Sequence, residues 1–278
     1  MHIANPIYDV VFKYLMSDGK IARLLIGAII EEEILELHFN PQEYSTTIES
    51  PSLTVYRLDF CATIKTENGS KQILIEIQKA KFATDIMRFR KYLGDHYAQK
   101  DNNALPIISI YFLGYSLNIE APLIQVKRHY YDVIGDHKEI HQKSKFIESL
   151  THNSYIIQIP HLSLRFKTDI EILLSVFDQQ TITADHHILN VKEELFPEKY
   201  RYLIRRLQKA AAEPELRKTM DIEDEILEEL QDKERLIARL LSKNTEQETA
   251  LQEKERALKA KEQEKERALK EKDLEKEL

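Results

Sequence analysis

The sequence predicts an α/β domain, with a mixed central sheet flanked by helices, followed by a helical region and a long C-terminal helix. Residues 54–78 alternate apolar and polar side chains on both sides of Asn68-Gly69, which is a strong signal for two strands joined in a hairpin. Apolar residues recur at helical spacing in residues 7–15, and residues 106–114 form an apolar run typical of a buried strand. Strands and helices therefore intermix along one chain, as in an α/β fold.

The other elements follow from local signals. Pro6 suits a first helical turn, and Asp18-Gly19 separates that helix from a more apolar one over 21–30. The sequence then predicts, in order, a strand over 33–39, the hairpin, a helix over 83–100, strands over 106–114, 125–133 and 155–159, and helices over 170–177 and 198–212. From residue 169 onward the chain is expected to be almost wholly helical, and residues 138–151 are ambiguous.

The predicted hairpin places three polar side chains on one face of the sheet. With a two-residue turn at Asn68-Gly69, Asp59 faces Gln78, and Glu76 lies on the diagonal. Two carboxylates on a diagonal can converge on one cation, and Mg²⁺ commonly takes one or two carboxylates beside water and substrate phosphate. We therefore predict a divalent-metal site suited to phosphodiester hydrolysis, in which the metal neutralises phosphoryl charge and lowers the pKa of the attacking water.

The order of these residues resembles the PD-(D/E)XK nuclease superfamily. Asp59 is followed on the next strand by Glu76-Ile77-Gln78, which matches the core pattern. Three further features resemble the Rpn-like branch, which includes recombination-promoting nucleases and nuclease-family transposases: Asp9–Lys13, Arg88–Tyr92 on the following helix, and a helical end with Phe177-Asp178 before a charged tail. The resemblance covers about residues 5–240 and implies a restriction-endonuclease-like sheet and a metal-dependent DNA endonuclease.

By this resemblance, Asp59 and Glu76 are metal ligands, the Ile77 backbone carbonyl is a third, and Asp9 adds an outer carboxylate. The implied cofactor is Mg²⁺, with Mn²⁺ as an alternative. Gln78 stands where the wider superfamily has a catalytic Lys, and we expect it to position the attacking water. A neutral amide cannot offset charge as an ammonium does. Leu58 stands before Asp59, where the superfamily pattern has Pro.

Four side chains are predicted to contact DNA: Lys13, Lys79, and the pair Arg88 and Tyr92, which lie four apart on one helical face. Simpler interpretations stay open for the whole set. The carboxylates could pair with Arg57 or Lys79 on a solvated face, Gln78 could merely bond Asp59, Asp9 could stabilise a helix start, and Arg88 and Tyr92 could pack at the edge of the core.

The C-terminal tail has its own periodicity. Apolar or amide residues lie seven apart in the tail, at Leu230, Ile237, Asn244, Leu251 and Leu258, and Leu227 and Leu241 add a partial second seam. Residues 253–263 nearly repeat as 264–274, an 11-residue period that favours a straight or slightly right-handed supercoil. Two interpretations stay open: a weak coiled coil that makes the protein a homodimer, and a solitary solvated helix stabilised by Glu–Lys pairs.

Charge neither supports nor excludes DNA binding. The net charge is −7, but residues 221–278 hold 13 Lys and Arg against 19 Asp and Glu, whereas residues 1–220 hold 27 against 28. Phosphate binding would therefore depend on a local basic patch.

Composition and the absence of certain motifs argue against several other classes of protein. The longest apolar runs, 24–30 and 107–113, are too short to span a bilayer, and no signal peptide is visible, so we expect a cytoplasmic protein without a membrane partner. Cys61 is the only cysteine, which excludes an internal disulfide and a Cys-based zinc cage. His137 and His141 lack an HExxH pattern, and six glycines form neither a P-loop nor a dinucleotide-binding motif.

The predicted organisation is a nuclease core over 1–165, a helical extension over 166–220 and a charged long helix over 221–278. The first hypothesis for function is a Mg²⁺-dependent DNA endonuclease that acts as a homodimer. The alternative is a nuclease-fold module that binds DNA or protein without turnover and acts through its tail. A purely structural coiled-coil protein is a third hypothesis, which the polar face of the hairpin disfavours.

Overall fold

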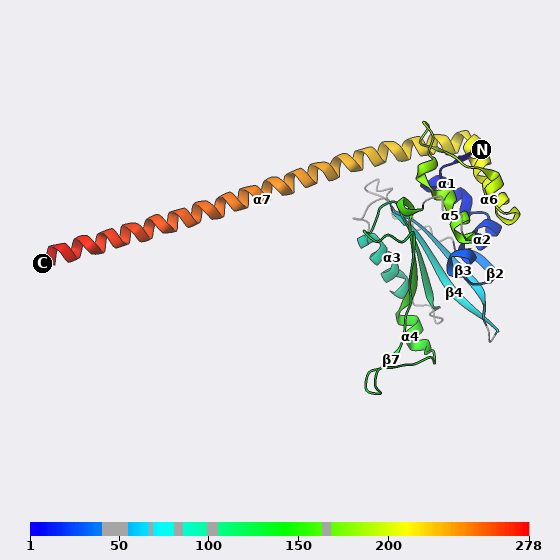
Figure 1. Cartoon of the computed structure of the whole chain (residues 1–278), viewed down its shortest axis with the longest axis horizontal. Helices are drawn as coiled ribbons and strands as arrows, with labels where there is room; N and C mark the ends of the chain where they lie inside the picture. Colours follow the sequence, from blue (N-terminus) through cyan, green and yellow to red (C-terminus); the bar gives the residue numbers. More distant parts are fainter. Residues whose placement is uncertain (41–54, 67–68, 81–85, 99–104, 163–167, 278) are drawn as a thin grey trace. The chain divides into compact units, whose positions relative to one another are not determined.

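The computed structural model describes residues 1–40, 55–66, 69–80, 86–98, 105–162 and 168–277. It contains a mixed six-stranded sheet flanked by helices and ends in a long helix, so the predicted α/β fold class is confirmed (Figure 1). The chain forms two units, Met1–Ile226 and Leu227–Leu278.

The helices are α1 (Asp9–Met16), α2 (Gly19–Ile30), α3 (Ile86–Ala98), α4 (Lys145–Leu150), α5 (Asp169–Leu174), α6 (Glu198–Ala212) and α7 (Pro214–Glu277). The strands are β1 (His2–Ala4), β2 (Ile34–Asn40), β3 (Val55–Thr66), β4 (Gly69–Ala80), β5 (Ile107–Leu113), β6 (Leu123–Val126), β7 (Tyr131–Asp132), β8 (Lys138–Glu139), β9 (His152–Gln158) and β10 (Ile188–Asn190).

The central sheet has the strand order β2-β3-β4-β5-β9-β6. β2, β3 and β4 form an antiparallel meander, β5 and β9 continue the sheet in parallel with β4, and β6 closes it antiparallel to β9. The connection from β4 to β5 contains α3, because parallel neighbours need a crossover. In Figure 1, α3 covers one face of the sheet, and α1, α2, α5 and α6 lie on the other.

The side chains of each strand alternate between these two layers. On the face toward α1 and α2, the sheet contributes buried apolar residues such as Phe60, Ile75, Ile77 and Phe112, which join the main core. On the face toward α3, Phe89 packs with Ala80 and Leu113 in a much smaller apolar cluster. The second face therefore has room for polar side chains.

The hairpin forms, but the predicted register is wrong by two residues. Asp59 lies opposite Glu76, rather than opposite Gln78, and the last pair before the turn is Thr66 with Gly69. Gly69 has a φ of 123°, a backbone conformation that favours glycine, and it begins β4 instead of forming the turn. Residues 67–68, which include Asn68, lie outside the described residues. A shift of two residues preserves the face of every side chain, so the predicted grouping of Asp59, Glu76 and Gln78 is kept.

Two strands were missed because their partners are distant in sequence. β1 pairs with β10 near the end of the domain, through Ile3 and Leu189, so the segment after residue 169 is not wholly helical. The segment predicted as one strand over 125–133 is divided between β6 and β7. A three-residue strand carries too short a pattern to be recognised without its partner.

Residues 166–220 belong to the same unit as the sheet, and the division of the chain falls inside α7, after Ile226. α6 packs against β1 and α1 with a buried apolar stripe formed by Tyr200, Leu203, Ile204, Leu207 and Ala210. Beyond Ile226, α7 carries large apolar side chains that are more than half exposed, such as Leu236, Ile237 and Leu241. Within the described residues, no helix is both long enough and apolar enough to cross a membrane.

Candidate functional site

A row of polar side chains crosses the sheet beneath α3. Asp59 on β3 pairs with Glu76 on β4, Glu76 pairs with Ser109 on β5, and Ser109 pairs with Ser154 on β9. Paired positions point to the same face of a sheet, so the four side chains share the α3 face. All four are buried. We call these residues the polar row.

Gln78 lies on the same face, two residues beyond Glu76 along β4, and is fully buried beside Tyr111. Its side-chain Nε2 donates a hydrogen bond to Oε1 of Glu76. Its Oε1 atom has no hydrogen-bond partner within the described part of the chain. Because buried amide oxygens are normally satisfied, this atom marks a place where a further donor or a cation would be stabilised.

The oxygen atoms at this position fit a hard divalent cation. Asp59 and Glu76 supply two carboxylates from a direct cross-strand pair, roughly 4.5–5.5 Å apart at Cβ. Like charges at such a pair repel, and Mg²⁺ prefers oxygen ligands of this type. Gln78 Oε1 and the backbone carbonyl of Ile77, the residue between Glu76 and Gln78, are further oxygens on the same strand. Among the described residues, no three His, Cys, Asp or Glu side chains are grouped to hold a metal.

Two tyrosines lie within electrostatic range of Glu76. Burial, with a further contribution from the Glu76 carboxylate, raises the pKa of Tyr111 to about 12. Burial and the same carboxylate also raise the pKa of Tyr97, on α3. Both hydroxyls therefore stay protonated near neutral pH and can act as hydrogen-bond donors in this region.

Tyr97 also contacts a histidine that sequence analysis missed. Its hydroxyl lies 2.8 Å from Nδ1 of His152, the first residue of β9. Burial, with the nearby Arg128 guanidinium, lowers the pKa of His152, so its imidazole is neutral at pH 7. The only available signal was its position just before a predicted strand. Ser109 and Tyr111, by contrast, were recognisable as the polar alternation within the apolar run of β5.

Lys79 lies on the opposite face of the sheet from the polar row. Its ammonium is buried, 2.5 Å from Oδ1 of Asp9, and donates a hydrogen bond to the carbonyl of Ile7. It also lies 5.6 Å from the ring centre of Phe12. The predicted DNA contact by Lys79 is therefore corrected to a structural ion pair, because alternate residues of a strand face opposite layers. Asp9 belongs to this pair, and the structure does not bring it to Asp59 and Glu76.

The first turns of α7 complete this second cluster. The Glu223 carboxylate accepts hydrogen bonds from the backbone N–H groups of Asp9 and Val10, both at 2.8 Å. It thereby caps α1, whose own preceding residue, Tyr8, makes no side-chain cap. Burial and the Asp9 carboxylate raise the pKa of Glu223. We call Asp9, Lys79 and Glu223 the buried ion cluster.

The other predicted DNA contacts are divided between the two layers. Lys13 is exposed on α1, which covers the face opposite the polar row. Arg88 and Tyr92 are on α3, the helix above the polar row, but their side chains lie outside the described residues.

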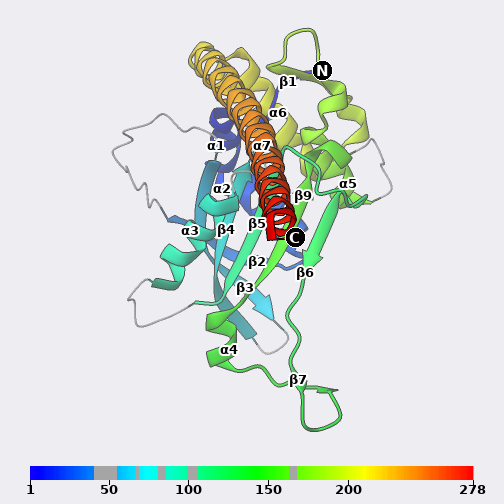
Figure 2. The ribbon, with the colours of Figure 1, turned by 90° about the vertical axis from the view of Figure 1, so that its left-hand side faces the viewer.

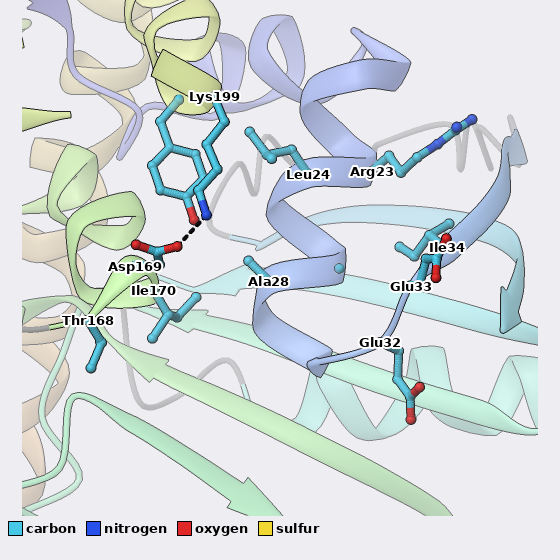
Figure 3. A pocket seen from close by; sticks show the side chains of 12 residues that line it. Arg23, Leu24, Ala28, Glu32, Glu33, Ile34, Thr168, Asp169, Ile170 and Lys199 are labelled. Atoms are coloured by element: carbon cyan, nitrogen blue, oxygen red, sulfur yellow. Dashed lines mark hydrogen bonds and ion pairs between the residues drawn. The ribbon is translucent and has the colours of Figure 1, made fainter. Parts of the chain in front are cut away.

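A groove of about 520 Å³ lies elsewhere, between α2, the start of β2 and the starts of α5 and α6. Figure 3 shows Leu24, Ala28 and Ile170 along its floor, with the Asp169–Lys199 ion pair on one side. No residue of the polar row lines it. The groove is lined by α2, α5 and α6, which lie on the face opposite the polar row (Figure 1), so it is not the predicted metal site.

No family model matches the chain, and no curated protein or solved structure matches it either.

Proposed function

We propose that this protein is a cytoplasmic, Mg²⁺-dependent DNA endonuclease of the PD-(D/E)XK type, with Asp59 and Glu76 as metal ligands. The observation that carries the proposal is the direct pairing of these two buried carboxylates, with the Gln78 amide bonded to one of them. The mixed sheet flanked by helices, which the resemblance implies, supports it.

The side chains present suit phosphodiester hydrolysis. A bound Mg²⁺ would supply charge neutralisation at the phosphoryl oxygen and lower the pKa of the attacking water. Asp59, Glu76 and the carbonyl of Ile77 would hold it. Gln78 donates from Nε2 to Glu76, which fixes the orientation of its amide and leaves Oε1 to accept a hydrogen bond from water. The neutral Gln78 orients a water molecule without offsetting charge, as a lysine would.

A second candidate function is a nuclease-fold module that binds partners through α7 without turnover. The exposed apolar residues of α7 favour it: Leu236, Ile237, Leu240 and Leu241 are each more than half exposed, within two helical turns. The same residues support pairing of α7 with a second copy of the chain. Dimerisation is compatible with either function.

The test is nicking of supercoiled plasmid DNA in Mg²⁺ by the parent protein, Asp59→Asn and Glu76→Gln. We expect each variant to lose at least about a thousand-fold in rate, since each removes a ligand charge that metal-ion catalysis needs. Glu36→Gln, at an exposed carboxylate on β2, is the matched control and should cut at the parental rate. Full cleavage by both site variants would reject the assignment.

Calorimetry separates the two candidates. The endonuclease should bind Mg²⁺ or Mn²⁺ in the millimolar range or tighter, and Glu76→Gln should abolish that binding. Intact DNA binding by a parent protein that binds neither metal would favour the non-catalytic module.

A further inference from the structure

The β7–β8 hairpin carries the most exposed large apolar side chains of the described part of the domain. Ile134 is 97% exposed and Val133 is 72% exposed, and both lie in the connection between the two short strands. Phe146, on the neighbouring α4, is 72% exposed. Figures 1 and 2 show this hairpin extending beyond the end of the sheet on the side of α4. An exposed apolar tip of this kind costs solubility and indicates a contact surface.

The base of the hairpin is firmly attached to the domain. The Tyr130 hydroxyl donates to the buried Glu148 carboxylate of α4, and Arg128 donates to the same carboxylate at 3.0 Å. Arg128 also bonds Asn153 of β9 and the carbonyl of Thr151. The hairpin is therefore fixed at its root by a network of charge-assisted hydrogen bonds.

The tip itself has a defined conformation. Oδ1 of Asp132 accepts hydrogen bonds from the backbone N–H groups of Ile134 and Gly135, at 3.1 and 2.8 Å. A Cβ atom at Gly135 would lie 2.3 Å from Oδ2 of Asp132, so only glycine allows this turn without displacing the carboxylate. A tip ordered in this way loses little conformational entropy when it binds.

Basic side chains are frequent along this hairpin and at its root. Residues 127–145 hold five Lys and Arg against three Asp and Glu, a formal excess of two positive charges, and one of the five, Arg128, is paired with Glu148. A pocket of about 450 Å³ at the root is lined by Lys71, Lys143 and Lys145 and by Glu148, with which Lys71 is paired at 3.5 Å. The surroundings therefore carry excess positive charge, which complements phosphates.

We propose that this hairpin is a DNA-binding wedge: Val133 and Ile134 insert between base pairs of a duplex, while Lys143, Lys145 and Lys71 contact the phosphates beside them. Isoleucine is among the apolar residues that wedge between base steps and kink a duplex. A membrane surface is less well matched, since stable membrane binding needs a larger apolar face or a second anchor. The proposal rests on the proposed function and adds how the DNA is gripped.

The root of the hairpin and the polar row share strand β4. Lys71 and Glu76 are both on β4, five residues apart, which is roughly 16 Å along a strand. That span corresponds to about five base pairs of B-DNA, at roughly 3.4 Å each. A duplex held at the root of the hairpin and directed along β4 would reach the level of Glu76.

The test measures binding and base unstacking by the full chain in EDTA, so that cleavage does not interfere. The probe is a 30-base-pair duplex with several 2-aminopurine bases, followed by fluorescence anisotropy and by 2-aminopurine emission. We expect the parent to raise the emission. Val133→Ser/Ile134→Ser should abolish the rise and weaken binding about tenfold with an unchanged salt slope. Lys143→Ala/Lys145→Ala should instead lower the salt slope by about two.

Leu195→Ser, at a half-exposed leucine far along the chain, is the matched control and should behave as the parent. No rise in emission with the parent, or an unchanged rise and affinity with the tip variant, would overturn the proposal. Loss of binding to phosphatidylserine vesicles by the tip variant, with DNA binding intact, would overturn it in favour of a lipid surface. A rise in 2-aminopurine emission that depends on the tip, without Mg²⁺-dependent nicking, would reject the nuclease function but support DNA binding by the hairpin.

Discussion

Gln78 and Lys79 are neighbours on β4, and both are almost completely buried, yet they serve two different regions of the molecule. Gln78 faces α3 and bonds Glu76 in the polar row. Lys79 faces α1 and is paired with Asp9 in the buried ion cluster. One residue along a strand separates a candidate catalytic environment from a structural one.

The two regions differ in how their polar groups are satisfied. Lys79 has a carboxylate, a backbone carbonyl and an aromatic ring around its ammonium, all supplied by the N-terminal segment. In the polar row two carboxylates face each other directly, and the Oε1 atom of Gln78 has no partner among the described residues. A buried ion pair satisfied within the fold serves stability, whereas the open Oε1 of Gln78 is consistent with the ligand site that we propose. Substitutions in the two regions should therefore differ in whether they lower stability or activity.

The largest effect on stability is expected at Lys79. Lys79→Met removes the cation that pairs with Asp9 and attracts Glu223 in the buried ion cluster, so the free energy of unfolding should fall by about 3–5 kcal/mol. Urea unfolding monitored by circular dichroism measures it. Adding Asp9→Asn to the same variant should restore part of the loss. A loss below about 1 kcal/mol would show that the ion cluster does not stabilise the domain.

The same replacement one residue earlier, Gln78→Met, should lower activity much more than stability. Gln78→Met removes the amide that bonds Glu76 and that we propose to orient water. We expect the nicking rate to fall about a hundred-fold, or roughly 2.7 kcal/mol in activation free energy. Its free energy of unfolding should change by no more than about 1 kcal/mol, the net contribution of one hydrogen bond. Unchanged nicking with reduced stability would place Gln78 with the structural residues.

The buried ion cluster should also respond to pH. Burial and Asp9 raise the pKa of Glu223 above its usual 4.5, so the folded protein holds this proton more tightly than the unfolded chain. The stability that it contributes is fully present below the unfolded pKa and is lost as pH rises through the folded pKa. Glu223→Gln removes the titrating carboxyl group, and with it this loss of stability at higher pH. Its melting temperature relative to the parent should therefore rise by roughly 2–4 °C between about pH 5 and about pH 8, measured by calorimetry. A constant difference at both pH values would contradict the raised pKa.

The smallest effect is expected at an exposed ion pair on the neighbouring strand. Lys65 lies 2.8 Å from Glu33, but both side chains are about 60% exposed. Lys65→Met should leave the melting temperature and the nicking rate unchanged, because solvent screens such pairs. A destabilisation comparable with that of Lys79→Met would show that burial does not explain the difference between the two lysines.

Much of the fold was predictable because local patterns are strong. The alternation around Asn68-Gly69 identified β3 and β4, and Asp18-Gly19 identified the start of α2, where the Asp18 carboxylate accepts hydrogen bonds from Lys20 and Ile21. The hairpin register was off by two because the conformation of Gly69, inside β4, is not encoded in the alternation. β1 and β10 were missed because each is short and is stabilised by the other.

The sequence by itself determined that Asp59, Glu76 and Gln78 share a face, since strand periodicity and a preserved parity require it. It also determined that the chain ends in a long charged helix, although this helix begins at Pro214 rather than at residue 221. Only the tertiary structure decided that Ser109, Ser154 and Tyr97 join that face, and that Lys79 and Asp9 turn away from it toward Glu223. These contacts connect residues up to 214 positions apart, and no local pattern specifies which layers of a sheet meet.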